Sequence, residues 1–258
     1  MQRWTGRVAV VTGASGGIGA AITQQLVKDG LKVVGLARRV DKVKEQSTAL
    51  RSEKGKLYGV KCDVTKEEDV KEAFKWVKSN LGGVDILINN AGGDSSSSLI
   101  DGPVENWKVI MDLNVMALSV CTKEALQVMK EKGVTDGHIV HINSTLGHFV
   151  PPAEFGFSMY AASKHAVTAL AEALRKELVK ENSKIKITSV SPGVVKTDFL
   201  VSSGTTLLSP EQMYSSNPHL LPKDVADAVT FALSTPPHVQ VSELKIQPVV
   251  VAVLSVVV

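Results

Sequence analysis

The chain has 258 residues, of which 44% are hydrophobic, and a formal net charge of +3. This length and composition predict one α/β domain with a large core, and the small, dispersed charge disfavours nucleic acid as a partner. The two cysteines, Cys62 and Cys121, give no sign of a disulfide framework and favour a reducing compartment. Because no hydrophobic signal region or membrane-spanning run is found, we expect a cytoplasmic protein without an integral membrane segment.

Short apolar, β-branched runs alternate with longer helical patterns along the chain. Strands are predicted at residues 7–12, 32–37, 57–61, 85–89, 138–142, 186–190 and 240–246. Helices are predicted at residues 18–29, 40–53, 66–80, 104–132, 160–181 and 223–233, the third opened by a capping box of Thr65 and Glu68. Strands separated by helices imply right-handed βαβ units. The predicted fold is a single Rossmann-type, doubly wound α/β domain over residues 1–248, with about seven mostly parallel strands and helices on both faces.

The last ten residues, 249–258, form an apolar tail rich in valine. Ten residues are about half of what a transmembrane helix needs, and β-branched residues favour an extended segment. A subunit interface or a last strand is our first interpretation, and a membrane-contacting or poorly ordered end is the alternative.

A glycine-rich turn directly follows the first predicted strand and opens the first helix. This context is what a dinucleotide-binding turn requires. Gly13 permits the tight turn, Gly17 lets the backbone approach a pyrophosphate, and Gly19 lets the helix pack close to the sheet. The predicted cofactor contacts here are Gly13, Ser15, Gly17, Ile18 and Gly19. A purely structural turn is the alternative.

The end of the second predicted strand discriminates between nicotinamide cofactors. Enzymes that use NAD usually carry an acidic residue there, whereas this chain has Ala37 followed by Arg38 and Arg39. Guanidinium groups could bind a 2′-phosphate bidentately, so the sequence favours NADP(H) over NAD(H). The alternative is that both arginines simply begin a solvated helix. At the end of the third strand, Asp63 either accepts a hydrogen bond from the adenine amino group or is a turn residue.

Tyr160 and Lys164 lie four residues apart on a predicted helix and therefore share one face. An ammonium close to the phenol would lower its pKa, so that the phenol could exchange a proton near neutrality. On its own the pair is weak evidence, since a solvated lysine beside a half-buried tyrosine is common.

The pair becomes specific evidence because it is one of four motifs that occur in a fixed order. They are Thr12-Gly13 to Gly19, Asn89-Asn90-Ala91-Gly92, Ser144, and Tyr160 with Lys164, and the segment 191–197 follows them. In this order the chain resembles the short-chain dehydrogenase/reductase family over nearly its whole length. The opening residues 1–4 and the stretch 146–148 are similar to a group within that family that includes insect farnesol dehydrogenases.

The resemblance implies a role for each matching residue. Ser144 would bind the substrate oxygen, Tyr160 would be the general acid or base, Lys164 would assist it, and Asn114 would anchor a water on the proton path. The implied cofactor contacts beyond the glycine-rich turn are Arg38, Arg39, Asp63, Val64, Asn90, Ala91, Gly92, Tyr160, Lys164, Pro192, Gly193, Val195 and Thr197. The resemblance also implies a homodimer or homotetramer, formed through the helices at 104–132 and 160–181.

The residues around the predicted site are mostly apolar, so a hydrophobic small-molecule alcohol or carbonyl is the expected substrate. The candidate substrate contacts are Ser144, Leu146, Phe155, Tyr160, Val194 and Phe199. An isoprenoid alcohol such as farnesol, or a steroid, is the leading candidate. The alternatives are a broad-specificity carbonyl reductase and a non-catalytic cofactor-binding scaffold. No metal site is expected, and His148 is a loop residue or a substrate contact.

Overall fold

The computed structural model describes residues 1–95, 97–199, 214 and 218–249. The strands are β1 (Val8–Thr12), β2 (Lys32–Ala37), β3 (Lys56–Lys61), β4 (Ile86–Asn89), β5 (His138–Ile142), β6 (Lys186–Pro192) and β7 (Glu243–Ile246). The α-helices are α1 (Gly17–Lys28), α2 (Val40–Ala49), α3 (Glu67–Leu81), α4 (Val104–Met111), α5 (Ala117–Lys132), α6 (Ser158–Lys180) and α9 (Pro222–Ser234). Shorter turns are η1 (Gln2–Trp4), η3 (Thr145–Gly147) and η4 (Ala153–Phe155), and a π-helical segment η2 (Asp112–Met116) joins α4 to α5.

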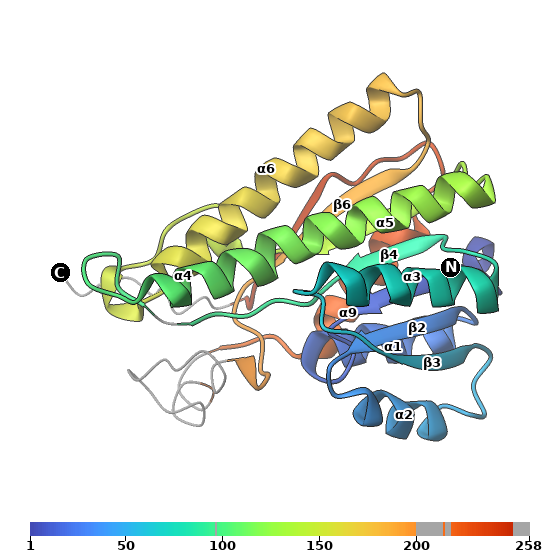
Figure 1. The fold of residues 1–258 in the computed structure, drawn as a ribbon, viewed down its shortest axis with the longest axis horizontal. Coiled ribbons are helices and arrows are strands. Elements are labelled where there is room, and N and C mark those ends of the chain that lie inside the picture. The colour runs from blue at the N-terminus through green and yellow to red at the C-terminus, as the bar shows by residue number, and fades with distance from the viewer. Residues whose placement is uncertain (96, 200–213, 215–217, 250–258) are drawn as a thin grey trace.

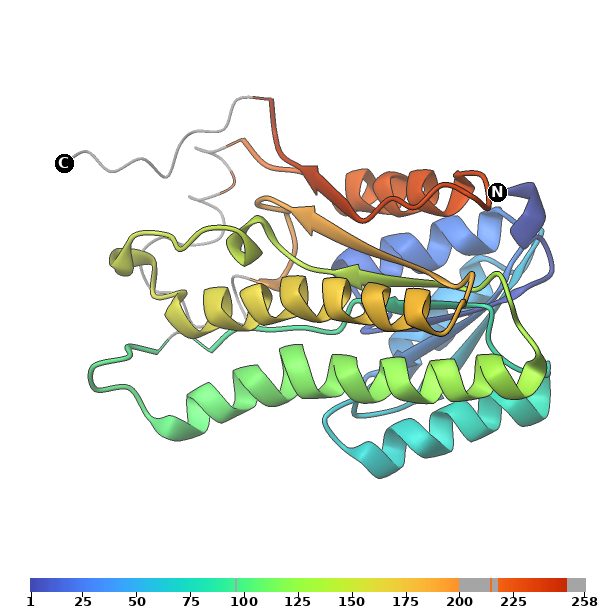
Figure 2. The same cartoon turned by 90° about the horizontal axis from the view of Figure 1, so that it is seen from above.

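The seven strands form one sheet in the order β3-β2-β1-β4-β5-β6-β7, and each neighbouring pair is parallel. Helices cover both faces of the sheet, with α3, α5 and α6 on one side and α1 and α9 on the other (Figures 1 and 2). The strand order reverses between β1 and β4, and ligands bind such sheets at this switch point, beyond the carboxyl ends of the strands. The predicted doubly wound α/β fold is confirmed.

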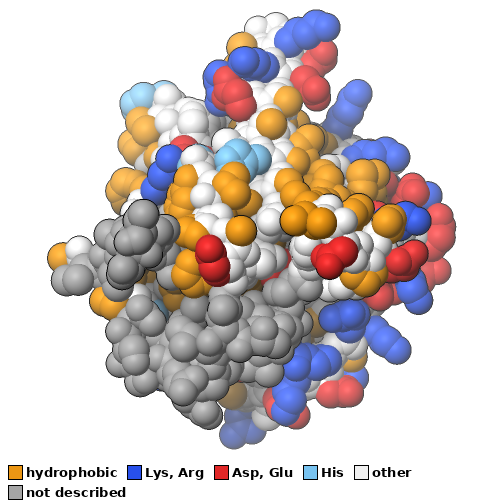
Figure 3. Space-filling model, turned by 90° about the vertical axis from the view of Figure 1, so that its left-hand side faces the viewer, with side chains coloured by type: hydrophobic (Ala, Val, Ile, Leu, Met, Phe, Trp, Pro, Cys, Tyr) orange, Lys and Arg blue, Asp and Glu red, His pale blue; other side chains and the backbone are white. Residues whose placement is uncertain are grey.

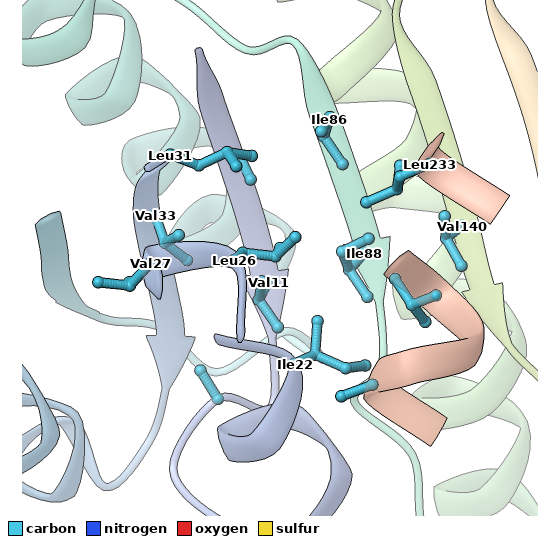
Figure 4. Close-up of a cluster of buried hydrophobic side chains, with 14 of the residues drawn as sticks. Val11, Ile22, Leu26, Val27, Leu31, Val33, Ile86, Ile88, Val140 and Leu233 are labelled. Atoms are coloured by element: carbon cyan, nitrogen blue, oxygen red, sulfur yellow. The ribbon is translucent and has the colours of Figure 1, made fainter. Parts of the chain in front are cut away.

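Each central strand contributes side chains to two separate hydrophobic cores. On β4, Ile86 and Ile88 belong to the core under α1 and α9, whereas Leu87 belongs to the core under α3 and α5. Figure 4 shows the first of these cores, in which Ile22 and Leu26 of α1 pack towards the sheet. Burial on both faces is why these strands are continuous apolar runs rather than alternating ones.

Several predicted elements differ from the structure, and the predicted helix 40–53 ends at Ala49. The last strand begins at Glu243 rather than at residue 240. The predicted capping box is wrong, because the Thr65 hydroxyl donates to Asp63 Oδ1 (2.7 Å) and α3 begins only at Glu67. The predicted helix 104–132 is interrupted by η2, a widening of the helix at residues 112–116.

The apolar tail, residues 249–258, lies outside the described residues except for Val249, which is fully exposed. None of the helices in the described part of the chain is long and apolar enough to cross a membrane.

Candidate active site

The glycine-rich turn between β1 and α1 forms a cradle, and side chains at its glycine positions would fill the space in it. Gly13 and Gly17 have φ angles of 67° and 53°, a region that favours glycine. A Cβ on Gly19 would lie 2.3 Å from the Gly13 carbonyl oxygen, so only glycine lets α1 approach the turn this closely. Among the described residues no side chain caps the start of α1, which leaves its first N–H groups available to an anion. The turn therefore fits a pyrophosphate.

Asn90 joins this turn to the carboxyl end of β4. Its Nδ2 donates to the carbonyl oxygens of Thr12 (2.9 Å) and Gly13 (3.3 Å), and the Thr12 hydroxyl accepts the N–H groups of Asn90 and Ala91. A Cβ on Gly92 would lie 3.7 Å from Lys164 Nζ. The structure thus brings three predicted motifs to one crevice, and Asn90 braces the crevice.

The two arginines after β2 lie at the outer end of the crevice. A Cβ on Gly16 would lie 3.6 Å from Nη2 of Arg39, so this guanidinium lies over the glycine-rich turn. An open cavity of about 560 Å³ adjoins it and is lined by Arg38, Lys61, Asp63, Lys66, Asp69 and Glu72. Burial opposes ionisation of Asp63, but hydrogen bonds from Thr65 N (3.2 Å) and Oγ1 (2.7 Å) and the charge of Arg38 outweigh it and lower the carboxyl pKa.

Ser144 and Tyr160 meet beyond the end of β5. Ser144 begins η3 and accepts the N–H of Leu146 (3.1 Å), and Tyr160 lies buried in the first turns of α6. A hydrogen bond from the Ser144 side chain favours the phenolate, but burial opposes it more strongly and raises the pKa of Tyr160. The negative charge of Asp94 raises this pKa further. The sequence-based prediction of a lowered phenol pKa is therefore wrong for this structure.

Lys164 does not lower the pKa of Tyr160 here, because its ammonium is engaged elsewhere. Lys164 Nζ donates to the carbonyl oxygen of Ile142 at 3.0 Å and lies 5.6 Å from the centroid of the Tyr160 ring. Burial lowers the pKa of Lys164 to about 8. The shared helix face was predicted correctly, but the partner of the ammonium was not.

Asn114 lies in the π-helical segment η2, and its amide is bound on both sides. Its Oδ1 accepts the N–H of Gly93 (2.9 Å), and its Nδ2 donates to the carbonyl of Gly93 (2.8 Å) and to Ser163 Oγ (3.0 Å). Ser163 in turn donates to the carbonyl oxygen of Tyr160 (2.7 Å). The π-helical widening places Asn114 beside α6, and such segments often occur at functional sites. Ser163 had no sequence signal as a link between them.

The segment after β6 closes the crevice over the start of α1. A Cβ on Gly17 would lie 3.3 Å from Cγ2 of Thr197, so the two motifs are adjacent. The hydroxyl of Tyr214 accepts the Thr197 N–H (3.3 Å) and lies 3.0 Å from the Thr197 carbonyl oxygen. Gly193 N donates to Ile246 O (2.8 Å), which ties this segment to β7. Tyr214 was not predicted as part of the site.

Aromatic rings flank Tyr160 on the substrate side. The ring centroids of Phe157 and Phe199 lie 5.9 and 5.3 Å from that of Tyr160. Phe199 was among the residues predicted to contact the substrate. Exposed apolar side chains gather on this end of the molecule (Figure 3), and those in its loops include Leu99, Ile100, Phe149 and Val150.

The other sequence candidates are distributed as follows. Val64 and Ala91 lie near Thr12 and Cys121, around a gap too small to admit a water molecule. Val194 and Val195 bond through their backbone to Leu220 and Tyr214. His148 contacts Ser191 and Glu243. In the part of the chain that the structure describes, no group of three or more His, Cys, Asp or Glu residues could hold a metal ion.

Comparison with known proteins agrees with this geometry. A sequence profile of the family described as short chain dehydrogenase matches residues 7–207. Farnesol dehydrogenase of Aedes aegypti is 50% identical over 257 residues, which cover 96% of this chain and 98% of that protein. Dehydrogenase/reductase SDR family member 11 of Bos taurus is 48% identical over 254 residues, with the same coverage. The solved structure of an alcohol dehydrogenase from the archaeon Thermococcus sibiricus, complexed with 5-hydroxy-NADP, is 29% identical and has a TM-score of 0.80, covering 94% of this chain and 97% of that one.

Proposed function

The chain belongs to the short-chain dehydrogenases, an oxidoreductase family, and we propose that it interconverts a hydrophobic alcohol and its aldehyde or ketone with NADP(H). An isoprenoid alcohol such as farnesol, or a steroid, is the proposed substrate. The observation that carries the proposal is the hydrogen-bonded pair of the buried Tyr160 and the half-buried Ser144, beside the dinucleotide cradle. Two hydroxyl donors at one point suit an oxygen that gains negative charge.

Each of the proposed site residues would have its own role in the reaction. A bound nicotinamide cofactor supplies or accepts the hydride. Ser144 and Tyr160 would both hydrogen-bond the substrate oxygen, and Tyr160 would give it a proton during reduction. Lys164 and Asn114 would hold the nicotinamide end of the crevice and connect the phenol to solvent. The glycine-rich turn and Thr197 would hold the phosphates.

The raised pKa of Tyr160 favours reduction at neutral pH. A phenol that stays protonated can act as a general acid towards a developing alkoxide, but it is a poor base in the protein as described. Oxidation of an alcohol should therefore become faster as the pH rises.

The choice of NADP(H) is supported by the cations at the outer end of the crevice. Arg39 lies over the glycine-rich turn, and Arg38 with Lys61 and Lys66 lines the adjoining cavity, where they face Asp63, Asp69 and Glu72. Ala37 ends β2 without a carboxylate that would repel a 2′-phosphate. The archaeal alcohol dehydrogenase of similar fold was solved with an NADP derivative, which supports the same choice.

A hydrophobic, uncharged substrate is supported by the surroundings of Tyr160. Phe157 and Phe199 flank its ring, and apolar side chains gather on the same end of the molecule (Figure 3). The charge of Asp94 acts on Tyr160, so it would disfavour an anionic substrate at this point. The similarity to a farnesol dehydrogenase suggests which hydrophobic substrate to test first.

The decisive experiment measures NADPH oxidation with farnesal and with ketosteroids, and NADP⁺ reduction with the matching alcohols. We expect turnover by the native protein and a loss of roughly 10²–10⁴-fold in kcat for Tyr160→Phe. Undiminished turnover by Tyr160→Phe would remove the proposed mechanism. Equal activity on small ketones would instead identify a broad-specificity carbonyl reductase. Tight NADPH binding without turnover on any carbonyl would identify a cofactor-binding scaffold.

Two further properties stay predictions. A homodimer or homotetramer is proposed from family membership, with α4, α5 and α6 as the contact surface, and size-exclusion chromatography with light scattering tests it. A reducing, cytoplasmic location is proposed because Cys62 and Cys121 are both buried and free.

A further inference from the structure

Three side chains from three different elements meet next to the proposed active site. Nε2 of His148, which follows η3, lies 3.0 Å from Oγ of Ser191 on β6 and 3.3 Å from Oε1 of Glu243 on β7. Ser191 is fully buried, and the side chains of His148 and Glu243 are 17% and 28% exposed. The Oε1 atom of Glu243 is itself buried. We call these three residues the His148 clasp.

The His148 clasp has the composition of a hydrolytic triad but not its geometry. In such a triad the acid binds Nδ1 of the histidine and the serine binds Nε2. Here both partners face the same nitrogen, and Ser191 has no exposed surface through which a substrate could reach it. The clasp is therefore a structural connection and not a second nucleophilic site.

The two contacts of the imidazole differ in kind. Nε2 of His148 forms a hydrogen bond with Ser191 Oγ, in which the imidazole tautomer decides which of the two atoms donates. Oε1 of Glu243 lies at ion-pair distance from the same nitrogen and has no hydrogen-bond partner among the described residues. A histidine that carries a proton on Nε2 can therefore offer it to a buried carboxylate oxygen that otherwise has no donor.

The clasp joins the turn that carries Ser144 to β6, which ends at the proposed cofactor contact Pro192, and to β7. His148 N donates to Thr145 O (3.0 Å), and Gly147 N donates to Ser144 O (2.9 Å), so His148 and Ser144 belong to one tight turn. On the other side, Ser191 directly precedes Pro192 at the end of β6. His148 therefore connects the turn that carries Ser144, on the proposed substrate side, with the end of β6, on the proposed nicotinamide side.

We propose that His148, held by Glu243 and Ser191, is a positioning residue that fixes the Ser144 hydroxyl opposite Tyr160. The inference rests on the proposed function, because it assigns to His148 the placement of the second donor to the substrate oxygen. A displacement of about 1 Å at such a donor can reduce the rate by roughly 10²-fold. Nothing in the arrangement requires His148 to touch the substrate or the cofactor.

The test compares His148→Ala, His148→Gln and the control His238→Ala, whose histidine is exposed in the loop before β7. We expect His148→Ala to lower kcat with a carbonyl substrate by roughly 10- to 100-fold, with NADPH affinity within about twofold of the native value. His148→Gln should restore most of the rate, because its amide nitrogen can reach the place of Nε2. Glu243→Gln should lower kcat in the same direction but less.

A double-mutant comparison shows whether the effect acts through Ser144. In a Ser144→Ala background, His148→Ala should cause almost no further loss of kcat. Additive losses, or a glutamine variant as slow as the alanine variant, would overturn the inference.

Hydrogen exchange provides a readout that does not depend on turnover. The N–H groups of Leu146 and Gly147 bond to Ser144, so they should exchange faster in His148→Ala, with exchange in β1 unchanged. Unchanged exchange at these amides would overturn the inference. If the native protein shows no turnover but these amides respond as expected, the proposed function fails while the clasp stands.

Discussion

The ammonium of Lys164 donates a hydrogen bond to the carbonyl oxygen of Ile142 at 3.0 Å and lies 5.6 Å from the centroid of the Tyr160 ring. Lys164 is thus anchored to the end of β5, one turn along α6 from the phenol. Its burial lowers its pKa from 10.5 to about 8, so the protonated side chain is held at a cost in free energy. A costly buried charge next to a proposed catalytic hydroxyl is typical of functional sites.

Replacing Lys164 by Met should stabilise the protein and abolish its activity. The folded pKa of Lys164 lies below the unfolded value, so at pH 7 the buried ammonium costs up to about 3 kcal/mol. Methionine has a similar length and no charge, and it would remove this cost while leaving the Ile142 carbonyl oxygen unpaired. We expect a net gain of roughly 1–2 kcal/mol in the free energy of unfolding, measured with urea at pH 7.

Lys186→Met is the matched control for this prediction. The pKa of Lys186 is also lowered to about 8, but its ammonium bonds to Thr235, Pro236 and Val239 at the far end of β6. Because this substitution would leave the oxygens of Thr235, Pro236 and Val239 without their donor, it should destabilise the protein and leave the kinetics intact. A Lys164→Met variant that is destabilised to the same extent would contradict the prediction.

Replacing Arg38 and Arg39 by Ala should weaken the binding of NADP⁺ much more than that of NAD⁺. Hydrogen bonds to charged groups are worth roughly 1.5–3 kcal/mol, so each arginine that contacts the 2′-phosphate should contribute about 10- to 100-fold in Kd. Because Arg39 lies over the glycine-rich turn, Arg39→Ala should have the larger single effect. Titration of intrinsic fluorescence with each cofactor measures this, with the exposed Arg51→Ala as control. Equal losses for both cofactors would defeat the assignment.

The parts of the fold and site that follow from local patterns could be predicted from the sequence. The apolar run 86–88 is buried on both faces of the sheet, and the glycines at 13, 17 and 19 occupy positions that require them. Tyr160 and Lys164 share a helix face because helical spacing places them there.

Other features depend on contacts between distant segments, which no local pattern shows. The predicted capping box required the Thr65 hydroxyl to bond to the start of α3. The hydroxyl donates to Asp63 instead, because Asp and Thr side chains compete for nearby hydrogen-bonding groups. The raised pKa of Tyr160 depends on its burial at the start of α6 and on the charge of Asp94, neither of which is visible in the sequence. The meeting of His148 with Glu243 spans 95 positions of the chain and depends on the pairing of β6 with β7.

Replacing Tyr214 by Phe should raise the KM for the cofactor with little effect on kcat. The Tyr214 hydroxyl holds the backbone at Val195 and Thr197, and Thr197 lies against the start of α1. Losing a hydrogen bond of about 1 kcal/mol corresponds to roughly fivefold in affinity. Steady-state kinetics with varied NADPH measure the change, and Tyr58→Phe on β3 is the control. A large fall in kcat with an unchanged KM would show that Tyr214 acts on the chemical step instead.

The two buried histidines of β5 should make the protein lose stability as the pH falls from 7 to 5. Burial lowers the pKa of both His138 and His141 to about 3, whereas an unfolded histidine titrates near 6.5. Between these values the unfolded chain binds two protons that the folded chain does not, so the stability present above pH 6.5 is lost as the pH falls. Each histidine should cost about 2 kcal/mol between pH 7 and pH 5, a range in which carboxylates titrate little.

Single variants separate the two contributions. His138 lies 2.8 Å from Thr188 Oγ1, and that hydroxyl donates to Val241 O, so Nε2 of His138 is the donor and glutamine can replace it there. Urea unfolding of His138→Gln at pH 7 and pH 5 should show about half of the native pH dependence, whatever its absolute stability. His238→Gln, which changes an exposed histidine, should keep all of it. A native protein equally stable at both pH values would show that these imidazoles are not held neutral by burial. Urea unfolding of His141→Gln at pH 7 and pH 5 would then show whether His141 takes up a proton in the folded protein.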